Sequence, residues 1–233
     1  MRRNLTNFLL AGLLAVTPSL AADVGTADVG AADVGAADVV AADVGVADFE
    51  AEDANALARI TEYLNGIESA EGQFFQIGPD GSTEEGVFYL RKPGRVRFEY
   101  AAPNPNLIIA DGSTIAIENS DLKTTDRYPL IDSPIQLLLS DDVDLATDPR
   151  ISSVHREVGA LSVTARQEDG LVPGEITIEF IDSGTGLELR QWEVVDAQGL
   201  RTIVALTEFR EGVSLSPALF IIEDQSPFER REF

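Results

Sequence analysis

Residues 86–100 constrain the fold of this chain more than any other stretch. Two runs in which apolar and polar side chains alternate, 86–92 and 95–100, flank the turn Pro93-Gly94. Because successive side chains of a strand point to opposite faces, these runs predict two antiparallel strands, 86–92 and 95–101, joined as a hairpin. One face of that hairpin should carry Phe88, Leu90, Val96, Phe98 and Tyr100, with Lys92 at its rim. The resulting apolar wall suits either a core or an apolar ligand.

Short runs of the same kind fill most of the remaining chain. We expect further strands at 71–77, 106–111, 114–119, 122–127, 154–158, 161–167, 175–181, 189–195 and 202–209, and a shorter terminal run around 219–222. Turn residues such as Gly, Pro, Asn and Asp separate them. Roughly eleven strands against two or three short helices predict a mainly β fold in which one large antiparallel sheet curls into an unclosed barrel.

Two helices are expected to cover this sheet as a lid. The first spans 53–66, opens at Asp53 as a capping residue, and has an apolar stripe made of Leu57, Ile60 and Leu64. The second follows Ser133-Pro134, which combines an N-cap with a proline at the first helical position. It is short and very apolar. The acidic stretch 141–148 could add one more helical turn.

The chain begins with the pattern of an export signal. Arg2 and Arg3 precede an apolar run at 8–16 and small residues that end at Ala21. This arrangement is typical of a cleavable secretory signal, and the apolar run is shorter than the ~20 residues that a membrane-spanning helix needs. We therefore expect residues 1–21 to be a signal peptide and the mature protein to be soluble.

Residues 22–52 form an acidic, low-complexity tract. An Asp recurs every five residues from Asp23 to Asp48, mostly followed by Val. A period of five fits neither a helix nor a strand, and Val, Ala and Gly bury too little apolar area to offset the entropy of ordering. We expect a disordered linker, with a stacked pentapeptide solenoid as the alternative. The folded domain then spans 53–233.

The composition narrows the classes of function. The chain has no Cys, so disulfides, thiolate metal sites and a Cys nucleophile are excluded. The formal net charge is −23 and becomes −25 once Arg2 and Arg3 are removed, which disfavours a nucleic-acid partner. His155 is the only histidine and no nucleophile-elbow sequence accompanies it. We expect no enzyme activity, no cofactor and no metal, although Asp141, Asp142 and Asp144 leave a weak calcium site as an alternative.

Three later strands carry apolar stripes like that of the hairpin. They consist of Ile176, Ile178 and Phe180, then Trp192 and Val194, then Val204 and Leu206. Each stripe alone is typical of a core. Together they form more apolar surface than a few short helices can cover, which favours a dry cavity. Acyl chains gain ~0.8 kcal/mol for each methylene that they bury in such a cavity.

Several of these segments resemble a known family. They are GVFYLRKPG at 86–94, VRFEY at 96–100, Pro103 ahead of IADG at 109–112, SPI at 133–135 with Leu137 and Leu138, and WEVVDAQG at 192–199. In their order and spacing, and together with the signal peptide, they resemble the LolA family of outer-membrane lipoprotein carriers. The resemblance runs from about Asp53 to about Ile222.

The resemblance implies a half-open β-barrel in the periplasm of a Gram-negative bacterium. Members of the family accept an acylated lipoprotein from an inner-membrane ABC exporter, shield its acyl chains, and pass it to an outer-membrane receptor. By analogy we expect a monomer without covalent chemistry. The expected lipid-binding residues are Phe88, Leu90, Val96, Phe98, Tyr100, Ile109, Leu137, Leu138, Ile176, Ile178, Phe180, Trp192, Val194, Val204 and Leu206.

The family's lid latch, an Arg before a Pro, falls on Lys92 in this chain. A lysine offers single-point rather than bidentate bonding, and Arg91 lies beside it. The chain also has Ala116 and Glu118 where the family often has aromatic residues.

Two other readings stay open. One is a carrier or sensor for a different lipid on the same fold, and the other is a secreted structural β-domain without a cavity. The related receptor family, LolB, is itself lipid-anchored, and the lack of Cys favours the carrier.

Overall fold

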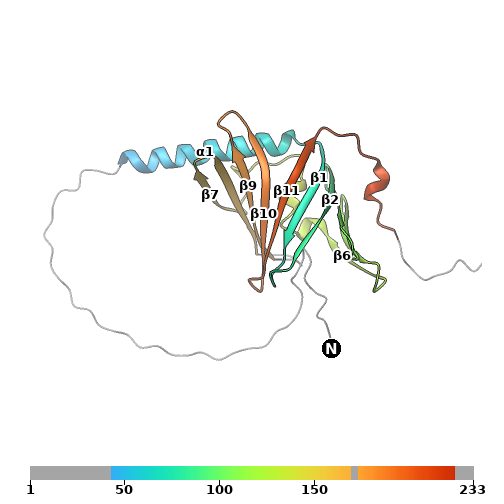
Figure 1. Ribbon diagram of the computed structural model, residues 1–233. Coiled ribbons are helices and arrows are strands. Elements are labelled where there is room, and N and C mark those ends of the chain that lie inside the picture. Colours follow the sequence, from blue (N-terminus) through green and yellow to red (C-terminus); the bar gives the residue numbers. More distant parts are fainter. Residues whose placement is uncertain (1–42, 169–172, 224–233) are drawn as a thin grey trace, which may run out of the picture.

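The computed structural model describes residues 43–168 and 173–223, and a single curved antiparallel sheet dominates them (Figure 1). The expected signal peptide and most of the acidic repeat lie outside the described residues. Six strands come first: β1 (Ser69–Ile77), β2 (Thr83–Arg91), β3 (Arg95–Tyr100), β4 (Asn106–Asp111), β5 (Thr114–Asn119) and β6 (Thr124–Pro129). Five follow: β7 (Ile151–Glu157), β8 (Ala160–Gln167), β9 (Gly174–Asp182), β10 (Leu187–Asp196) and β11 (Arg201–Glu211).

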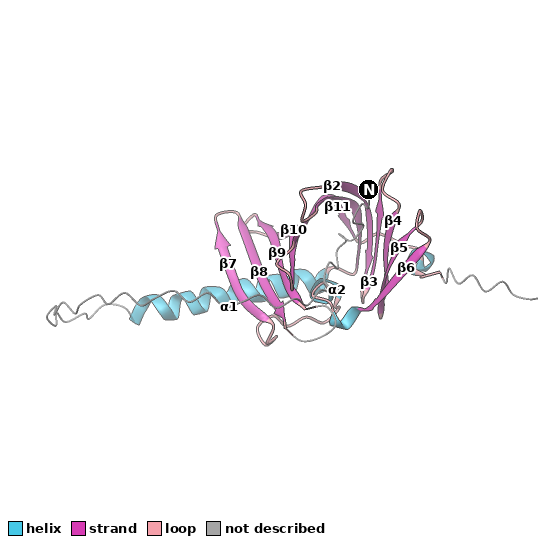
Figure 2. Ribbon diagram, turned by 90° about the horizontal axis from the view of Figure 1, so that it is seen from below, coloured by secondary structure: helices cyan, strands magenta, loops and turns pink. Residues whose placement is uncertain are grey.

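The order of the strands explains why the barrel is open. Across the sheet they run β6-β5-β4-β3-β2-β1-β11-β10-β9-β8-β7. Each half is therefore a simple meander, and the pairing of β1 with β11 joins the two halves. Within the described residues β6 and β7 form the two edges and do not pair with each other, although they follow one another along the chain. Figure 2 shows the sheet bent around a central space, with these two strands on opposite sides of it.

Alternating burial defines the concave face of the sheet. In β3 and β9 every second side chain is buried, as the period of a strand requires. The buried side chains of the two halves belong to one hydrophobic cluster, which also includes residues of the helices. The core of the domain thus lies inside the curve of the sheet, and the surface predicted to be apolar is the surface that faces it.

Two bulges shift which side chains reach the concave face. In β10 the register with β9 slips between Leu189 and Gln191, so both Leu189 and Trp192 point inward although they are three residues apart. In β11 a similar slip lies opposite Gly72, at Glu208, which has a positive φ of 54°. Phe209 consequently packs against the core. An extra residue in one strand has this effect because side chains otherwise alternate strictly.

A glycine opposite Phe74 makes room for its ring. Gly86 of β2 pairs with Phe74 and with Tyr100. A Cβ added at Gly86 would lie 2.8 Å from Cε1 of Phe74 and would also collide with the carbonyl oxygen of Glu99. The aromatic ring therefore uses the space that a side chain at this position would fill.

The helices differ most from expectation. Helix α1 spans Asp43–Gly66, so the expected start at Asp53 is wrong, and the last part of the acidic tract is helical rather than irregular. Helix α2 (Gln136–Leu139) is a single turn after the short 3₁₀ helix η1 (Leu130–Asp132), and Ile135 rather than Ser133 occupies its N-cap. The terminal run expected to be extended forms the 3₁₀ helix η2 (Pro217–Phe220). No described helix is long and apolar enough to cross a bilayer.

Helix α1 lies across the ends of β7 to β10 (Figures 1 and 2). Its buried side chains, Ala56, Ile60 and Leu64, recur every four residues and form the stripe that faces the sheet. Polar contacts also bind the helix to the sheet. Arg59 donates two hydrogen bonds of 2.8 and 2.6 Å to the carboxylate of Asp182, at the end of β9. The expected apolar stripe is confirmed for Ile60 and Leu64, whereas Leu57 is half-buried and Ala56 completes the buried row.

The strand bounds were predicted closely. The expected ranges 106–111 and 114–119 coincide with β4 and β5. The others differ from expectation by one to three residues at an end, as fraying and register shifts allow.

We predict that Gly86→Ala lowers the free energy of unfolding by about 1–3 kcal/mol, because the added methyl group overpacks the contact with Phe74 and Glu99. Urea unfolding followed by circular dichroism measures the change. Gly66→Ala is the matched control, since a Cβ at Gly66 meets nothing within 4 Å. Equal stability of the two variants would contradict the predicted role of Gly86.

Candidate functional site

The concave face collects nearly all of the residues predicted to contact an acyl chain. Except for Ile109 and Val194, each of them is at most 8% exposed and belongs to one hydrophobic cluster. Leu137 and Leu138 of α2 lie in the same cluster as the strand residues, so the short helix covers the face that the strands provide. Val194 is half-buried and packs against the cluster. Structure thus brings together residues that are far apart in the sequence.

Aromatic rings form the centre of this face. The ring of Phe98 makes edge contacts with Phe74 and with Trp192, at centroid distances of 5.2 and 6.1 Å, and lies 6.2 Å from Phe88. Phe74 also meets Tyr100 edge-on, at 5.1 Å. These rings come from strands β1, β2, β3 and β10. Both halves of the sheet therefore contribute to one apolar surface, which the hairpin alone could not form.

Sequence reasoning missed two aromatic members of the site. Phe74 lies on the inward face of β1, and the alternation within the expected strand 71–77 is the signal that would have found it. Phe209 stacks on Phe88 at 5.9 Å. It lies beyond the bulge at Glu208, where strict alternation from Val204 and Leu206 assigns it to the wrong face, so no simple pattern would have found it.

The prediction that Ile109 lies on the concave face is wrong. It pairs with Arg97, whereas its neighbour Ile108 pairs with Phe98, so Ile108 faces the concave side and Ile109 the outer side of the sheet. Ile109 is buried all the same, because the segment after β11 passes over it. A cavity of about 380 Å³ lies there, lined by Ile109, Arg97, Leu219 and others. The prediction assigned Ile109 to the wrong face because β4 is covered on both faces, so an apolar residue there need not point inward.

The concave face is closed by the chain between β6 and β7, residues 130–150, which we call the closing segment. Its contacts with the rest of the domain include backbone and side-chain hydrogen bonds. The amide of Gly94, in the hairpin turn, donates to the carbonyl of Leu139, at 2.8 Å. Asn65 at the end of α1 donates to the carbonyl of Val143 and accepts from its amide, both at 2.9 Å. The closing segment is thus bound to the hairpin and to α1.

Lys92 joins the hairpin to α1. Its Nζ donates a 2.6 Å hydrogen bond to the carbonyl oxygen of Leu64, in the last turn of the helix. A cation suits that position, because the carbonyl end of a helix carries partial negative charge. Burial lowers the pKa of Lys92 to about 8, and the carboxylate of Asp141 opposes the shift in part. The residue expected to hold a lid closed therefore does contact the helix, through a single bond.

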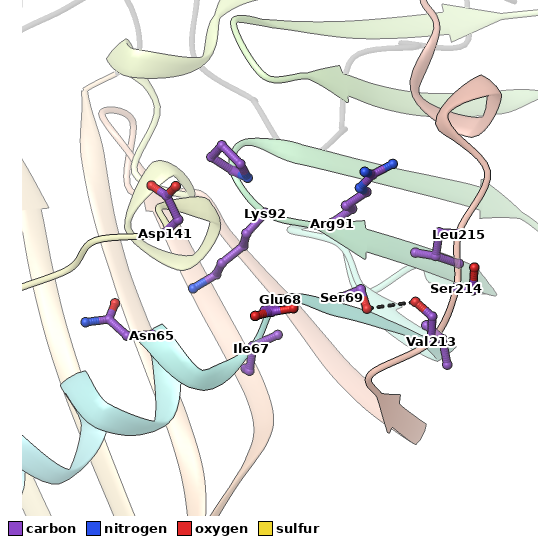
Figure 3. A pocket seen from close by; sticks show the side chains of 11 residues that line it. Asn65, Ile67, Glu68, Ser69, Arg91, Lys92, Asp141, Val213, Ser214 and Leu215 are labelled. Atoms are coloured by element: carbon purple, nitrogen blue, oxygen red, sulfur yellow. Dashed lines mark hydrogen bonds between the residues drawn. The ribbon is translucent and has the colours of Figure 1, made fainter.

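A pocket of about 540 Å³ surrounds this contact (Figure 3). Its lining includes Arg91 and Lys92 from the hairpin, Glu68 after α1 and Asp141 from the closing segment. Figure 3 shows Lys92 reaching toward the end of α1, between Asp141 and Ile67. The pocket marks the place where helix, hairpin and closing segment meet.

The candidate site is a sheltered apolar surface. The described residues hold no group of three or more His, Cys, Asp or Glu side chains that could bind a metal ion. His155 is exposed and lies 3.0 Å from Glu157. The feature that stands out is a wide apolar surface kept from water by a helix and a segment bound through few polar contacts.

Comparisons with known proteins point to one family. Residues 65–223 match the family described as outer membrane lipoprotein carrier protein LolA. An outer-membrane lipoprotein carrier protein of Alkalilimnicola ehrlichii is 26% identical over 73% of this chain and 80% of its own length. One from Xanthomonas axonopodis is 28% identical over 72% and 83%. A solved LolA superfamily protein from Nitrosomonas europaea covers 71% of this chain and 97% of its own, with 10% identity and a TM-score of 0.39.

We predict that Lys92 makes stability depend on pH in a defined window. Its pKa is about 8 in the folded protein and about 10.4 in an unfolded chain, so between these values the unfolded chain binds more protons and stability rises with pH. Burial of the charged ammonium lowers the stability of the fold. Above the window Lys92 is neutral in both states and this penalty is absent; the penalty is complete once the pH has fallen through about 8.

The test compares wild type with Lys92→Arg by urea unfolding near pH 7 and near pH 9.5. Because Arg stays charged throughout, the wild type should gain of order 1 kcal/mol relative to the variant at the higher pH, once solvent screening is allowed for. Effects of all other titrating groups cancel in this difference. A difference that does not change with pH would rule out a lowered pKa at Lys92.

Proposed function

This chain belongs to the LolA family of outer membrane lipoprotein carrier proteins, and on that basis we propose that it binds the acyl chains of lipoproteins on its concave face. The proposal extends to the route: cargo is accepted from an inner-membrane ABC exporter, carried through the periplasm, and delivered to a receptor at the outer membrane. The protein is a chaperone for its cargo and performs no covalent step.

The observation that carries the proposal is a continuous apolar face inside an open sheet. In the described state its side chains fill the space themselves, and rings such as those of Phe74, Phe98 and Trp192 touch one another. An acyl chain must therefore replace contacts between side chains rather than fill an empty hole. Each buried methylene contributes ~0.8 kcal/mol, so two or three long chains supply more than enough free energy to part these side chains.

Closure by few polar contacts suits a carrier that must also release its cargo. A neutral hydrogen bond contributes only about 0.5–1.5 kcal/mol net, because water replaces it on opening. The bonds of Asn65 to Val143 and of Gly94 to Leu139 are of this modest kind, whereas the bond from the charged Lys92 to Leu64 contributes about 1.5–3 kcal/mol. The partly buried ammonium of Lys92 also regains water on opening. Such a lid can open for cargo and close without it.

Delivery in one direction requires that each partner bind the cargo more weakly than the next. A carrier takes up and releases cargo through a difference in affinity between its two conformations, open and closed. The self-filling of the concave face provides such a difference, since the empty protein recovers side-chain contacts when cargo leaves. This balance supports a carrier over a permanent lipid store.

We predict that the purified protein binds a fluorescent triacylated lipopeptide saturably, with one site per monomer, and does not bind the same peptide without acyl chains. Fluorescence titration and gel filtration measure the complex. A diacyl phospholipid serves as competitor: equal competition would favour a carrier for another lipid. Absence of saturable binding to every acylated ligand would contradict the proposal and favour a structural β-domain.

We predict that Asn65→Ala speeds loading of the same lipopeptide by about tenfold, because the variant loses two hydrogen bonds that hold the closing segment and leaves the concave face unchanged. Stopped-flow fluorescence measures the rate. Asn55→Ala is the matched control, since Asn55 is an exposed residue of the same helix. Unchanged rates in both variants would show that opening of this segment does not limit loading.

A further inference from the structure

Trp192 has an unpaired polar atom inside the apolar face. Its side chain belongs to the core, at 2% exposure, and its Nε1 is buried without a hydrogen-bond partner. An indole nitrogen can only donate a hydrogen bond, so no rearrangement of protons satisfies it. Burying such a donor costs the free energy of its lost hydration, and native proteins seldom leave it unpaired.

The neighbours of Trp192 explain why it finds no partner. In the sheet it lies between Ile178 of β9 and Val204 of β11, both fully buried. The ring of Phe98 contacts it at 6.1 Å. None of these side chains has an oxygen or nitrogen. The side chains that flank the indole therefore offer it no acceptor.

Two other polar side chains of this region have partners. The hydroxyl of Tyr100 donates to Oε1 of Gln76, at 2.8 Å, and Lys92 donates to Leu64. In the described part of the chain, the other buried side-chain atoms without partners are oxygens: Glu118 Oε1, Thr125 Oγ1, Gln167 Oε1 and Asp196 Oδ2. In the strand register Glu118 and Thr125 lie opposite each other on the outer face of β5 and β6. By alternation Gln167 and Asp196 lie on the inward side of β8 and β10, and their unpaired atoms are acceptors. Among the buried side-chain atoms of residues 43–168 and 173–223, Trp192 Nε1 is the nitrogen without a partner.

We propose that the indole N–H of Trp192 is kept for the cargo and donates a hydrogen bond to the carbonyl oxygen of an acyl ester. This inference rests on the proposed function, because it requires an acylated ligand on the concave face. The carbonyl is the strong acceptor that every acyl chain carries at its proximal end and that its methylenes lack. In an apolar environment such a bond is electrostatically stronger than in water.

The bond would do two things for a carrier. It distinguishes acyl lipids from hydrocarbon, because only the former satisfy the donor. The unpaired N–H also raises the free energy of the closed, empty state relative to the loaded one, since only loading removes its penalty. Trp192 is thus a specificity-determining residue, and the apolar residues around it supply the bulk of the affinity.

The experiment compares two lipids that differ only at this acceptor, a diacylglycerol and the dialkyl ether glycerol with chains of equal length. Ether oxygens are weaker acceptors than carbonyl oxygens. Wild type should bind the ester about fivefold more tightly, which corresponds to about 1 kcal/mol. The variant replaces Trp192 with β-(3-benzothienyl)alanine, which keeps the shape of the ring and lacks the N–H, and Trp192→Phe is the genetically encoded second variant.

Both variants should bind the ester and the ether with equal affinity. Trp192 is the only Trp of the chain, so its single indole N–H resonance provides a direct second readout. That resonance should move downfield with the ester and not with the ether. Circular dichroism confirms that each variant is folded.

An ester preference that survives loss of the N–H, or a wild type that binds both lipids equally, would overturn the role of Trp192 while leaving the carrier function intact. Failure of wild type to bind either lipid would overturn both proposals. The two failures are therefore distinguishable.

Discussion

The pairing of β1 with β11 is the contact on which the rest of the structure depends. It joins two meanders, β1 to β6 and β7 to β11, into one sheet and leaves β6 and β7 as its edges. Because these edges stay apart, the sheet curves without closing, and the 21 residues between them, 130–150, lie over the opening. The apolar concave face, the closing segment and the junction at Lys92 all follow from this one connection. A closed barrel of the same strands would have a sealed interior.

An open sheet with an apolar inner face must keep that face from water when no ligand is present. Here the side chains meet across the space, and rings from both halves of the sheet contact one another around Phe98. Closure is completed by α1 and the closing segment, whose apolar side chains join the same cluster and whose hydrogen bonds water can replace on opening. The apolar contacts therefore give the domain its stability, and the polar contacts of Asn65, Lys92 and Gly94 set how readily it opens. These two tasks fall on different residues.

Polar groups within this apolar region are placed unequally. Tyr100 and Gln76 satisfy one another, which makes them part of the permanent core. Lys92 is bonded, but burial lowers its pKa, so its charge is held at some cost. Trp192 has no partner for its N–H. The three groups differ in how many hydrogen-bond acceptors their positions offer. Tyr100 and Gln76 only build the fold, whereas Lys92 and Trp192 are suited to respond to a ligand.

Much of this could be predicted from the sequence, and the reason is local. Alternation of apolar and polar residues, with Pro and Gly at the turns, located every strand and fixed β4 and β5 to the residue, because strand period and turn geometry depend on neighbouring residues alone. The same alternation placed Phe88, Leu90, Val96 and Phe98 on one face. It failed where an assumption about local order failed. The start of α1 lay within a tract whose five-residue repeat indicates no helix, and bulges at Arg190 and Glu208 displaced the alternation.

The sequence by itself determined the strands, their inward stripes, the stripe of α1 and the resemblance to a family. Only the tertiary structure decided which buried residues share a face. Ile109 turned outward because its partner in β3 is Arg97, and burial by a distant segment hid this from any local pattern. It also decided that Lys92 meets the carbonyl of Leu64 and that Trp192 meets no acceptor at all. Both facts depend on segments far apart in the chain, and the identity of a hydrogen-bond partner, or its absence, is set by that packing.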